Sequence, residues 1–289
     1  MARKRKKLRK RRPFKIFIPF PLIMGGLAAC ILSYWVFSTG FMKHFRISAP
    51  SQQQRASENA VFNDKPKIIF VIDDIGYNLE QEANLQALGK NVVYAILPLL
   101  PYSKHFARQG RAAGADIILH MPLETVDGTV PGRGLITRNM SPLHVLEMLE
   151  TDLGSVPGHI GANNHMGSLG TSDPDLMRTI LKEMKRRHLI FLDSFTTPES
   201  VVSQIGQETG LPVVVRDIFL DNVDAKAPIR AQIRKLKYAS RQKGYAIAIG
   251  HYRKNTLEVL REDIPKLREE GFEILSLREL MRYLEKKKK

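Results

Sequence analysis

Short apolar runs rich in β-branched residues alternate with longer segments of helical spacing between residues 67 and 285. The longer segments place apolar residues three or four positions apart with charged residues between them, as in helices that cover a sheet. The predicted strands are Lys67–Ile72, Asn91–Leu97, Asp116–Leu119, His159–Ala162, Leu189–Leu192, Val213–Val215, Tyr245–Ile249 and Phe272–Leu275. The predicted helices are Leu79–Leu88, Ser103–Ala113, Pro142–Leu153, Asp175–Arg187, Ile229–Lys243 and Leu257–Glu270.

Regular alternation of strand and helix predicts an α/β fold in which parallel strands are covered by helices. Either a closed or deformed barrel or a doubly wound sheet satisfies this pattern. In both folds the carboxyl ends of the parallel strands face the same side of the molecule, so residues that follow the strands converge there.

The segment before the first strand has a different composition. Residues 1–15 contain ten Lys and Arg and no acid, and residues 16–42 form an uncharged run of 27 residues. A membrane-spanning helix needs about 20 apolar residues, and a basic flank stays on the cytoplasmic side. We therefore expect a single-pass signal anchor in a bacterial inner membrane, with the main domain periplasmic or otherwise extracytoplasmic.

Two other interpretations of the apolar run remain open. A cleaved signal peptide usually has an apolar core of about 7–15 residues and a small-residue cleavage site; this run is longer and no A-x-A site follows it. Leu27-Ala28-Ala29-Cys30 resembles a lipoprotein processing box, but the residues after Cys30 are apolar, whereas a lipoprotein usually continues into a polar tether.

The expected organisation has five parts. A basic cytoplasmic segment (1–15) precedes the transmembrane anchor (16–42), and a polar, flexible tether (43–66) leads to the barrel domain (67–285). Four lysines (286–289) form a tail, most simply the solvated end of a helix.

Composition and charge narrow the class of protein. The chain has 289 residues, 43% of them hydrophobic, and a single cysteine, which excludes an internal disulfide framework and a cysteine-cluster metal site. The net charge of +16 falls to +2 when the fourteen basic residues of 1–15 and 286–289 are set aside. The excess charge lies in the tails, so we expect no nucleic-acid partner for the folded body.

Polar residues follow nearly every predicted strand. Carboxylates and imidazoles that converge on one rim are the groups that a mononuclear hydrolytic metal site requires, because some hold the metal and others move protons. The residues at these strand ends are Asp73, Asp74, His120, Asn163, Asn164, His165, Asp193, Arg216, Asp217 and His251.

Five motifs resemble the divergent polysaccharide deacetylase family, a remote branch of the nodulation-protein-type carbohydrate esterases. They are Phe70–Gly76 (FVIDDIG), Leu119–Glu124 (LHMPLE), Asn163–Ser168 (NNHMGS), Leu192–Ser194 (LDS) and Ile247–His251 (IAIGH). The resemblance covers residues 67–285. It implies a deformed (β/α) barrel, usually of seven parallel strands, and a metal-dependent site.

Matched position by position, the resemblance implies roles for four residues. Asp73 corresponds to the general base, Asp74 to the first metal ligand, His120 to the start of the metal-binding histidine motif and His251 to the histidine that protonates the leaving amine. The implied cofactor is a divalent metal ion, Zn²⁺ being the expected one.

The chain also departs from the esterase pattern. Those enzymes carry a second histidine four residues after the first, where this chain has Glu124. His165 from the next strand can supply the missing imidazole; alternatively Glu124 ligates the metal itself or orients His120. No Arg-x-Pro-Tyr oxyanion motif is present, so backbone N–H groups or the side chains of Asn163 and Asn164 are the expected substitutes.

Four further residues stay open between functional and structural interpretations. Arg216, Asp217 and Asp221 either line a substrate groove or form a structural ion pair, and Asp193 either binds substrate or supports the metal ligands.

The favoured function is a membrane-anchored, metal-dependent hydrolase that removes acetyl groups from N-acetylated envelope polysaccharide, with peptidoglycan as the obvious periplasmic polymer. The alternative is a catalytically inactive envelope protein that keeps the barrel and binds glycan or a protein partner. A phosphatase-type domain also uses an acidic pair after its first strand, but three strand-end histidines and an exported location count against it.

Overall fold

The computed structural model describes residues 64–287. The predicted basic segment, membrane anchor and most of the tether therefore lie outside the described residues, as do Lys288 and Lys289. Among residues 64–287, no helix combines the length and the apolar character needed to cross a membrane.

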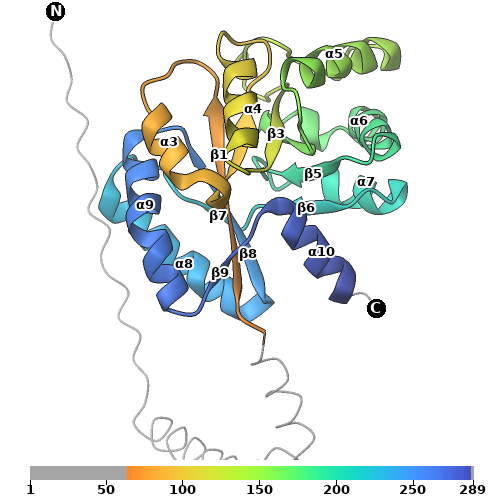
Figure 1. Cartoon of the computed structure of the whole chain (residues 1–289). Helices are drawn as coiled ribbons and strands as arrows, with labels where there is room; N and C mark the ends of the chain where they lie inside the picture. Colours follow the sequence, from red (N-terminus) through yellow and green to blue (C-terminus); the bar gives the residue numbers. More distant parts are fainter. Residues whose placement is uncertain (1–63, 288–289) are drawn as a thin grey trace, which may run out of the picture. The chain divides into compact units, whose positions relative to one another are not determined.

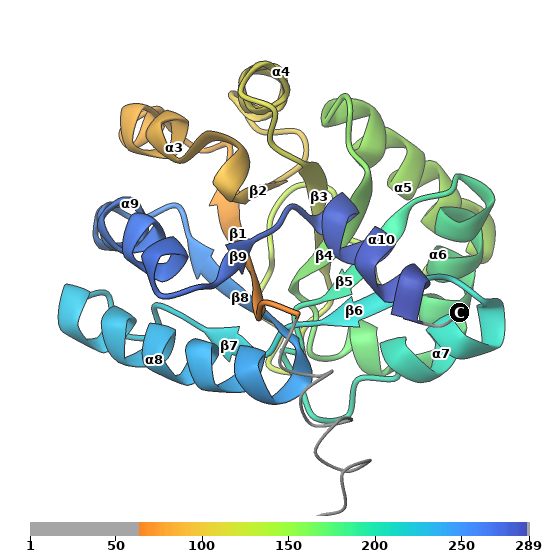
Figure 2. The same ribbon diagram turned by 60° about the horizontal axis from the view of Figure 1, so that its bottom comes forward.

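A parallel sheet forms the centre of the fold. Its strands pair in the order β6-β5-β4-β3-β2-β1-β8-β7, and a short β9 pairs with the start of β1. The sheet curls into a barrel that stays open between β6 and β7 (Figures 1 and 2). The strands are β1 (Lys67–Ile75), β2 (Val93–Ile96), β3 (Ile117–Leu123), β4 (Gly161–Met166), β5 (Ile190–Asp193), β6 (Val213–Val215), β7 (Ile218–Phe219), β8 (Tyr245–His251) and β9 (Glu273–Ile274).

Helices surround this sheet on its outer face, as Figure 2 shows from the end where the strands begin. One further helix, α10, lies across that end of the barrel instead of beside a strand. The helices are α3 (Glu82–Leu88), α4 (Ser103–Ala112), α5 (Pro142–Ser155), α6 (Pro174–Arg186), α7 (Val202–Thr209), α8 (Lys226–Lys243), α9 (Lys254–Glu269) and α10 (Leu277–Lys287), with single 3-10 turns η1 (Gly89–Asn91) and η2 (Gly170–Ser172).

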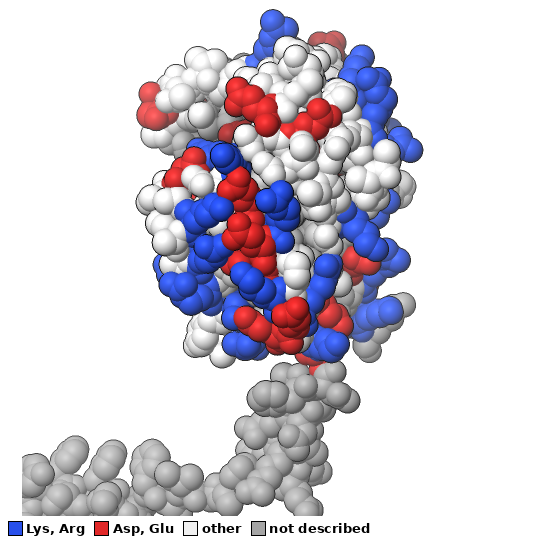
Figure 3. Space-filling view, turned by 60° about the vertical axis from the view of Figure 1, so that its left-hand side comes forward, with Lys and Arg blue, Asp and Glu red and all other residues white. Residues whose placement is uncertain are grey.

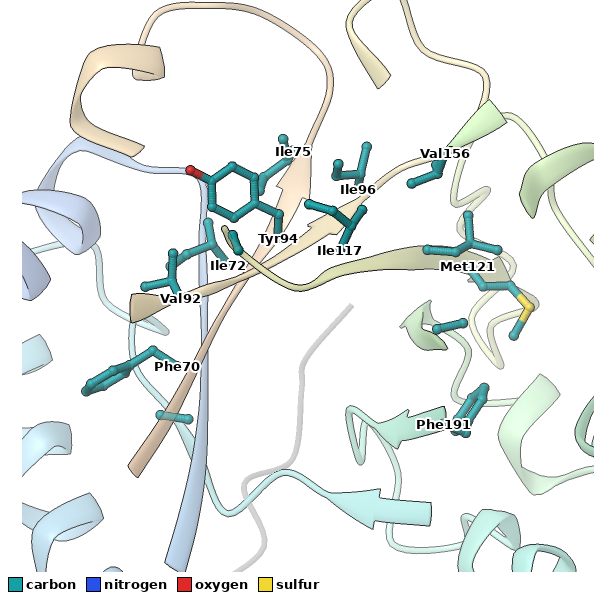
Figure 4. Packing of buried hydrophobic residues seen from close by; sticks show 14 of the residues in the cluster. Phe70, Ile72, Ile75, Val92, Tyr94, Ile96, Ile117, Met121, Val156 and Phe191 are labelled. Atoms are coloured by element: carbon teal, nitrogen blue, oxygen red, sulfur yellow. The ribbon is translucent and has the colours of Figure 1, made fainter. Parts of the chain in front are cut away.

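The alternation of side chains along each strand produces two cores. Successive strand residues point to opposite faces, so in β1 Phe70 and Ile72 pack outward against the helices while Ile69 and Val71 point into the barrel. Figure 4 shows part of the outer core, in which side chains from β1, β2, β3 and β5 pack together. Leu277 and Leu280 of α10 close the inner core at the end of the barrel where the strands begin.

The expected deformed α/β barrel of parallel strands is confirmed as a curled parallel sheet covered by helices. The number of strands is higher than the seven implied by the resemblance. Sequence analysis missed β7, because two residues are too few to show any periodicity. It also missed α7, whose sequence VSQIGQET contains weak helix formers. Sequence analysis took the lysine tail as the end of a helix without giving that helix a range; it is α10, which is amphipathic and runs on to Lys287.

The surface formed by α8 and α9 carries charges of both signs. Figure 3 shows acidic and basic side chains interleaved on this side of the molecule. Lys226 lies 2.8 Å from Glu258, and Arg230 lies 3.3 Å from Asp263. These pairs neutralise one another across the two helices, so this face offers no basic surface for a polyanion.

Candidate metal centre

The inward-facing column of residues in four strands ends in a polar side chain. In β8, Ile247 and Ile249 point into the barrel and His251 continues the column; in β3, Ile118 is followed by His120. The register places Asp73 opposite His251 across the β1–β8 pair. Period-two alternation therefore carries these groups to one interior position at the carboxyl ends of the strands.

A β-bulge lets two adjacent carboxylates reach the same site. Between Ile72 and Ile75, β1 contains one more residue than the facing segment of β2. Within this bulge Asp74 has a φ of +62°, a left-handed conformation that is uncommon for residues other than glycine. In regular strand geometry the neighbours Asp73 and Asp74 point to opposite faces, and the bulge turns Asp74 back toward the barrel mouth.

Asp74, His120 and His165 form a compact cluster. Asp74 Oδ1 lies 3.3 Å from His120 Nε2 and 3.2 Å from His165 Nδ1, and the two imidazole nitrogens are 3.0 Å apart. Ligands at about 2.0–2.1 Å from a tetrahedral zinc ion are about 3.3 Å from each other. Asp74 Oδ1 is buried and makes no hydrogen bond within residues 64–287. One carboxylate and two imidazoles, with an orphaned buried oxygen between them, fit a divalent metal.

The tautomer of His120 suits a metal ligand. His120 Nδ1 donates a hydrogen bond to Asn163 Oδ1 at 2.9 Å, which leaves the lone pair on Nε2 to face the cluster. The amide group of Asn163 donates in turn to Asp73 Oδ1 at 2.9 Å and to Ser194 Oγ at 3.1 Å. Outer partners of this kind fix the orientation of a ligating imidazole.

The two adjacent carboxyl groups titrate differently. Burial raises the pKa of Asp73, although the nearby imidazoles of His120 and His251 oppose the rise. Burial acts in the same direction on Asp74, but there the contacts with His120 and His165 outweigh it and hold the pKa well below its usual range. Asp74 thus stays ionised, as a metal ligand must, while Asp73 is the better proton acceptor.

His251 is paired with Asp221, which lies in the turn after β7. His251 Nδ1 donates to Asp221 Oδ1 at 2.9 Å, and Asp221 Oδ2 accepts from the His251 backbone N–H and from Thr256 Oγ1. Burial alone would lower the pKa of His251, but Asp221 raises it. His251 Nε2 is left facing the cluster, 3.8 Å from Asp74 Oδ2.

Sequence analysis left Asp221 open between a groove position and a structural ion pair, and did not predict that it pairs with His251. The Asp221 side chain is completely buried, and burial of a carboxylate requires partners of this kind. The signal in the sequence was weak, because Asp221 follows the two-residue strand that periodicity does not reveal.

Glu124 lies apart from the Asp74–His120–His165 cluster. Its Oε2 accepts a hydrogen bond from the Arg138 backbone N–H at 3.0 Å, and its carbonyl accepts from Leu169 and Gly170. Of the open alternatives, the one in which His165 supplies the second imidazole matches this geometry.

The two asparagines are committed to contacts within the protein. Asn164 Oδ1 accepts from the Ser194 backbone N–H at 2.8 Å, and Asn164 Nδ2 donates to the Met166 carbonyl at 2.8 Å. Since the Asn163 amide also has two acceptors, both side chains tie β4 to its neighbours, and an oxyanion donor must come from elsewhere, such as a backbone N–H.

Asp193, Arg216 and Asp217 do not join the cluster and make structural contacts. The Asp193 carboxylate accepts from the Phe195 backbone N–H and from Ser200 Oγ. Asp217 accepts from the Ile247 backbone N–H and pairs with Lys243 at the open seam. Arg216 donates to the carbonyls of Ser194 and Phe195.

Comparison with known proteins identifies the family. The model of the family described as divergent polysaccharide deacetylase matches residues 70–281, which contain every residue of the cluster and the His251–Asp221 pair. This chain belongs to the divergent polysaccharide deacetylase family. The resemblance drawn from the five sequence motifs is thereby confirmed.

Two relatives of the chain are uncharacterized proteins. One, from Haemophilus influenzae, is 37% identical over 204 residues, or 71% of this chain and 73% of the relative. The other, YibQ of Escherichia coli, is 30% identical over 201 residues, or 70% of this chain and 63% of the relative. Among solved structures, an uncharacterized protein from Agrobacterium tumefaciens C58 has a TM-score of 0.71 at 19% identity, covering 75% of this chain and 89% of that chain. It shares the fold.

Proposed function

We propose that this divergent polysaccharide deacetylase is a metal-dependent hydrolase that removes acetyl groups from N-acetylated envelope polysaccharide. The observation that carries the proposal is the Asp74–His120–His165 cluster, with Asp73 and the His251–Asp221 pair beside it. Metal ligands, a candidate base and a candidate acid thus meet at one place, and amide hydrolysis needs all three.

A divalent cation held by the cluster would polarise the acetamide carbonyl and lower the pKa of a water molecule. Asp73, whose pKa is raised by burial, would accept a proton from that water as its oxygen attacks the carbonyl carbon. His251, kept protonated by Asp221, would donate a proton to the nitrogen as the C–N bond breaks. Acetate and a free amine are the products, and Asn163 would hold Asp73 and His120 in position throughout.

The test is acetate release from chitin oligomers and muropeptides by the purified full-length protein loaded with Zn²⁺. We expect release to be abolished by Asp73→Asn, which keeps the shape of the side chain and removes the base. Asp175→Asn is the matched control, because this carboxylate on α6 is 97% exposed and pairs with Arg178, not with a residue of the cluster. A metal-loaded protein that releases no acetate from any N-acetylated substrate would overturn the enzymatic proposal and favour glycan binding alone.

We also propose that residues 16–42 anchor the protein in the inner membrane with the barrel in the periplasm. The uncharged run and its basic flank support this proposal. Alkaline phosphatase fused after residue 66 should be active in cells, and an inactive fusion would contradict the proposed topology.

A further inference from the structure

Two large apolar residues beside the cluster have left-handed backbone conformations. Met166, directly after His165, has a φ of +53°, and Phe195, after β5, has a φ of +49°. This region is unfavourable for residues with a Cβ, and bulky side chains rarely occupy it. Strained residues persist only where the surrounding structure holds them, and they concentrate at ligand sites.

Hydrogen bonds with polar side chains hold both residues in place. The Met166 carbonyl accepts hydrogen bonds from Asn164 Nδ2 at 2.8 Å and from Thr196 Oγ1 at 2.9 Å. The Phe195 backbone N–H donates to Asp193 Oδ1 at 2.8 Å, and its carbonyl accepts from Arg216 at 2.9 Å. The roles of Asp193, Asn164 and Arg216 are thus explained: they fix the two strained peptides.

The side chains that this scaffold positions do not enter the core. Met166 is 37% exposed and Phe195 is 43% exposed. Seven of the nine exposed large hydrophobic side chains among residues 64–287 lie at the carboxyl ends of strands or in the loops that follow them. They are Tyr77, Leu79, Val126, Val130, Met166, Phe195 and Val223. Burial in the core therefore does not account for the strain.

Phe195 is also linked by contacts to the candidate acid. The guanidinium of Arg216, which binds the Phe195 carbonyl, lies 5.0 Å from the centre of the Phe219 ring. The Phe219 ring packs edge-on against the His251 imidazole, with 5.1 Å between ring centres. Met166 directly follows the candidate ligand His165, and its carbonyl accepts a hydrogen bond from Thr196, the residue after Phe195. Met166 and Phe195 thus lie close to each other and beside the cluster.

We propose that Phe195, together with Met166, is a substrate-binding platform for a pyranose ring of a glycan chain. A pyranose carries its hydroxyl groups around the edge and presents C–H groups on its faces, and an aromatic ring or a thioether covers such a face. This inference deepens the proposed function and rests on it for the identity of the ligand. In this proposal the strained backbone of Phe195 serves to hold its ring in solvent beside the cluster.

Paired substitutions at Phe195 separate binding from stability. Phe195→Ala and Phe195→Gly both remove the ring, but only glycine tolerates a φ of +49°. We expect the Tm of Phe195→Gly to exceed that of Phe195→Ala by about 2–4 °C. Both variants should bind a chitin pentamer about tenfold more weakly than wild type or worse, to the same extent. If the ring only supported the fold, the more stable variant would bind better.

His188 provides the matched control, since it has a φ of +57° and lies before β5, at the opposite end of the strand. His188→Gly should likewise be more stable than His188→Ala, and both should bind the pentamer as wild type does.

Binding is measured by calorimetry on the full-length protein in detergent with EDTA, which prevents turnover. Wild-type affinity in either Phe195 variant, or no binding of the pentamer by wild type, would overturn the platform. Tight binding without acetate release in Zn²⁺ would overturn the proposed hydrolysis and leave the platform standing.

Discussion

Asp152 on α5 is a buried carboxyl group without partners among the described residues, and we expect it to make the stability of the protein depend strongly on pH. Its side chain is fully buried, and neither carboxylate oxygen has a hydrogen-bond partner within residues 64–287. Burial raises its pKa to about 8. Gly134 packs directly against it: a Cβ at that position would lie 2.3 Å from Asp152 Oδ1.

The size of the effect follows from proton linkage. In the unfolded chain the carboxyl group loses its proton near pH 3.8, whereas the folded protein keeps the proton until about pH 8. Between these values the unfolded state binds fewer protons, so the free energy of unfolding falls as the pH rises. At 1.36 kcal/mol for each pKa unit, the cost at pH 7 is about 4 kcal/mol. This is a large fraction of the ~5–15 kcal/mol that stabilises a typical domain.

Asp152→Asn keeps the shape of the side chain and removes its ionisation. We expect the variant to match wild type near pH 4 and to be about 2–4 kcal/mol more stable at pH 7. Urea unfolding followed by circular dichroism at several pH values measures the difference. Asp175→Asn, at an exposed position, should show no such gain. If Asp152→Asn is no more stable than wild type at pH 7, the carboxylate is ionised and has a partner, and the reasoning fails.

Three further outcomes are expected. His165→Ala removes one of three candidate ligands and should lower Zn²⁺ affinity by at least about 100-fold, and an unchanged zinc content in elemental analysis would contradict the cluster. Asp221→Asn removes the negative charge that raises the pKa of His251, so kcat should fall about 30-fold with little change in KM, and the alkaline limb of the pH profile should move to lower pH; an unmoved limb would refute this role. Gly161→Ala places a Cβ 2.3 Å from the Ile190 carbonyl oxygen, so the free energy of unfolding measured in urea should fall by about 1–3 kcal/mol. An unchanged free energy of unfolding would show that β4 and β5 can move apart at no cost.

The barrel and the convergence of its strand-end side chains could be predicted from the sequence. Strand periodicity is local: in β8, alternation alone places His251 on the same face as Ile247 and Ile249. The shared direction of parallel strands then brings Asp73 and His120 to the same end of the barrel. Most helices outside the barrel could also be predicted, because they carry a continuous apolar stripe; the short α7 was the exception.

The tertiary structure decided which side chains meet. The bulge that turns Asp74 toward His120 depends on the register with β2, and nothing in the local sequence specifies that register. Whether His165 or Glu124 joins Asp74 and His120 depends on the pairing of β3 with β4. Asp221 reaches His251 from the turn after the two-residue strand β7, and Asn163 joins Asp73 to His120 across the barrel. Periodicity reports which face a residue occupies, whereas distances of about 3 Å between residues far apart in sequence are set by packing.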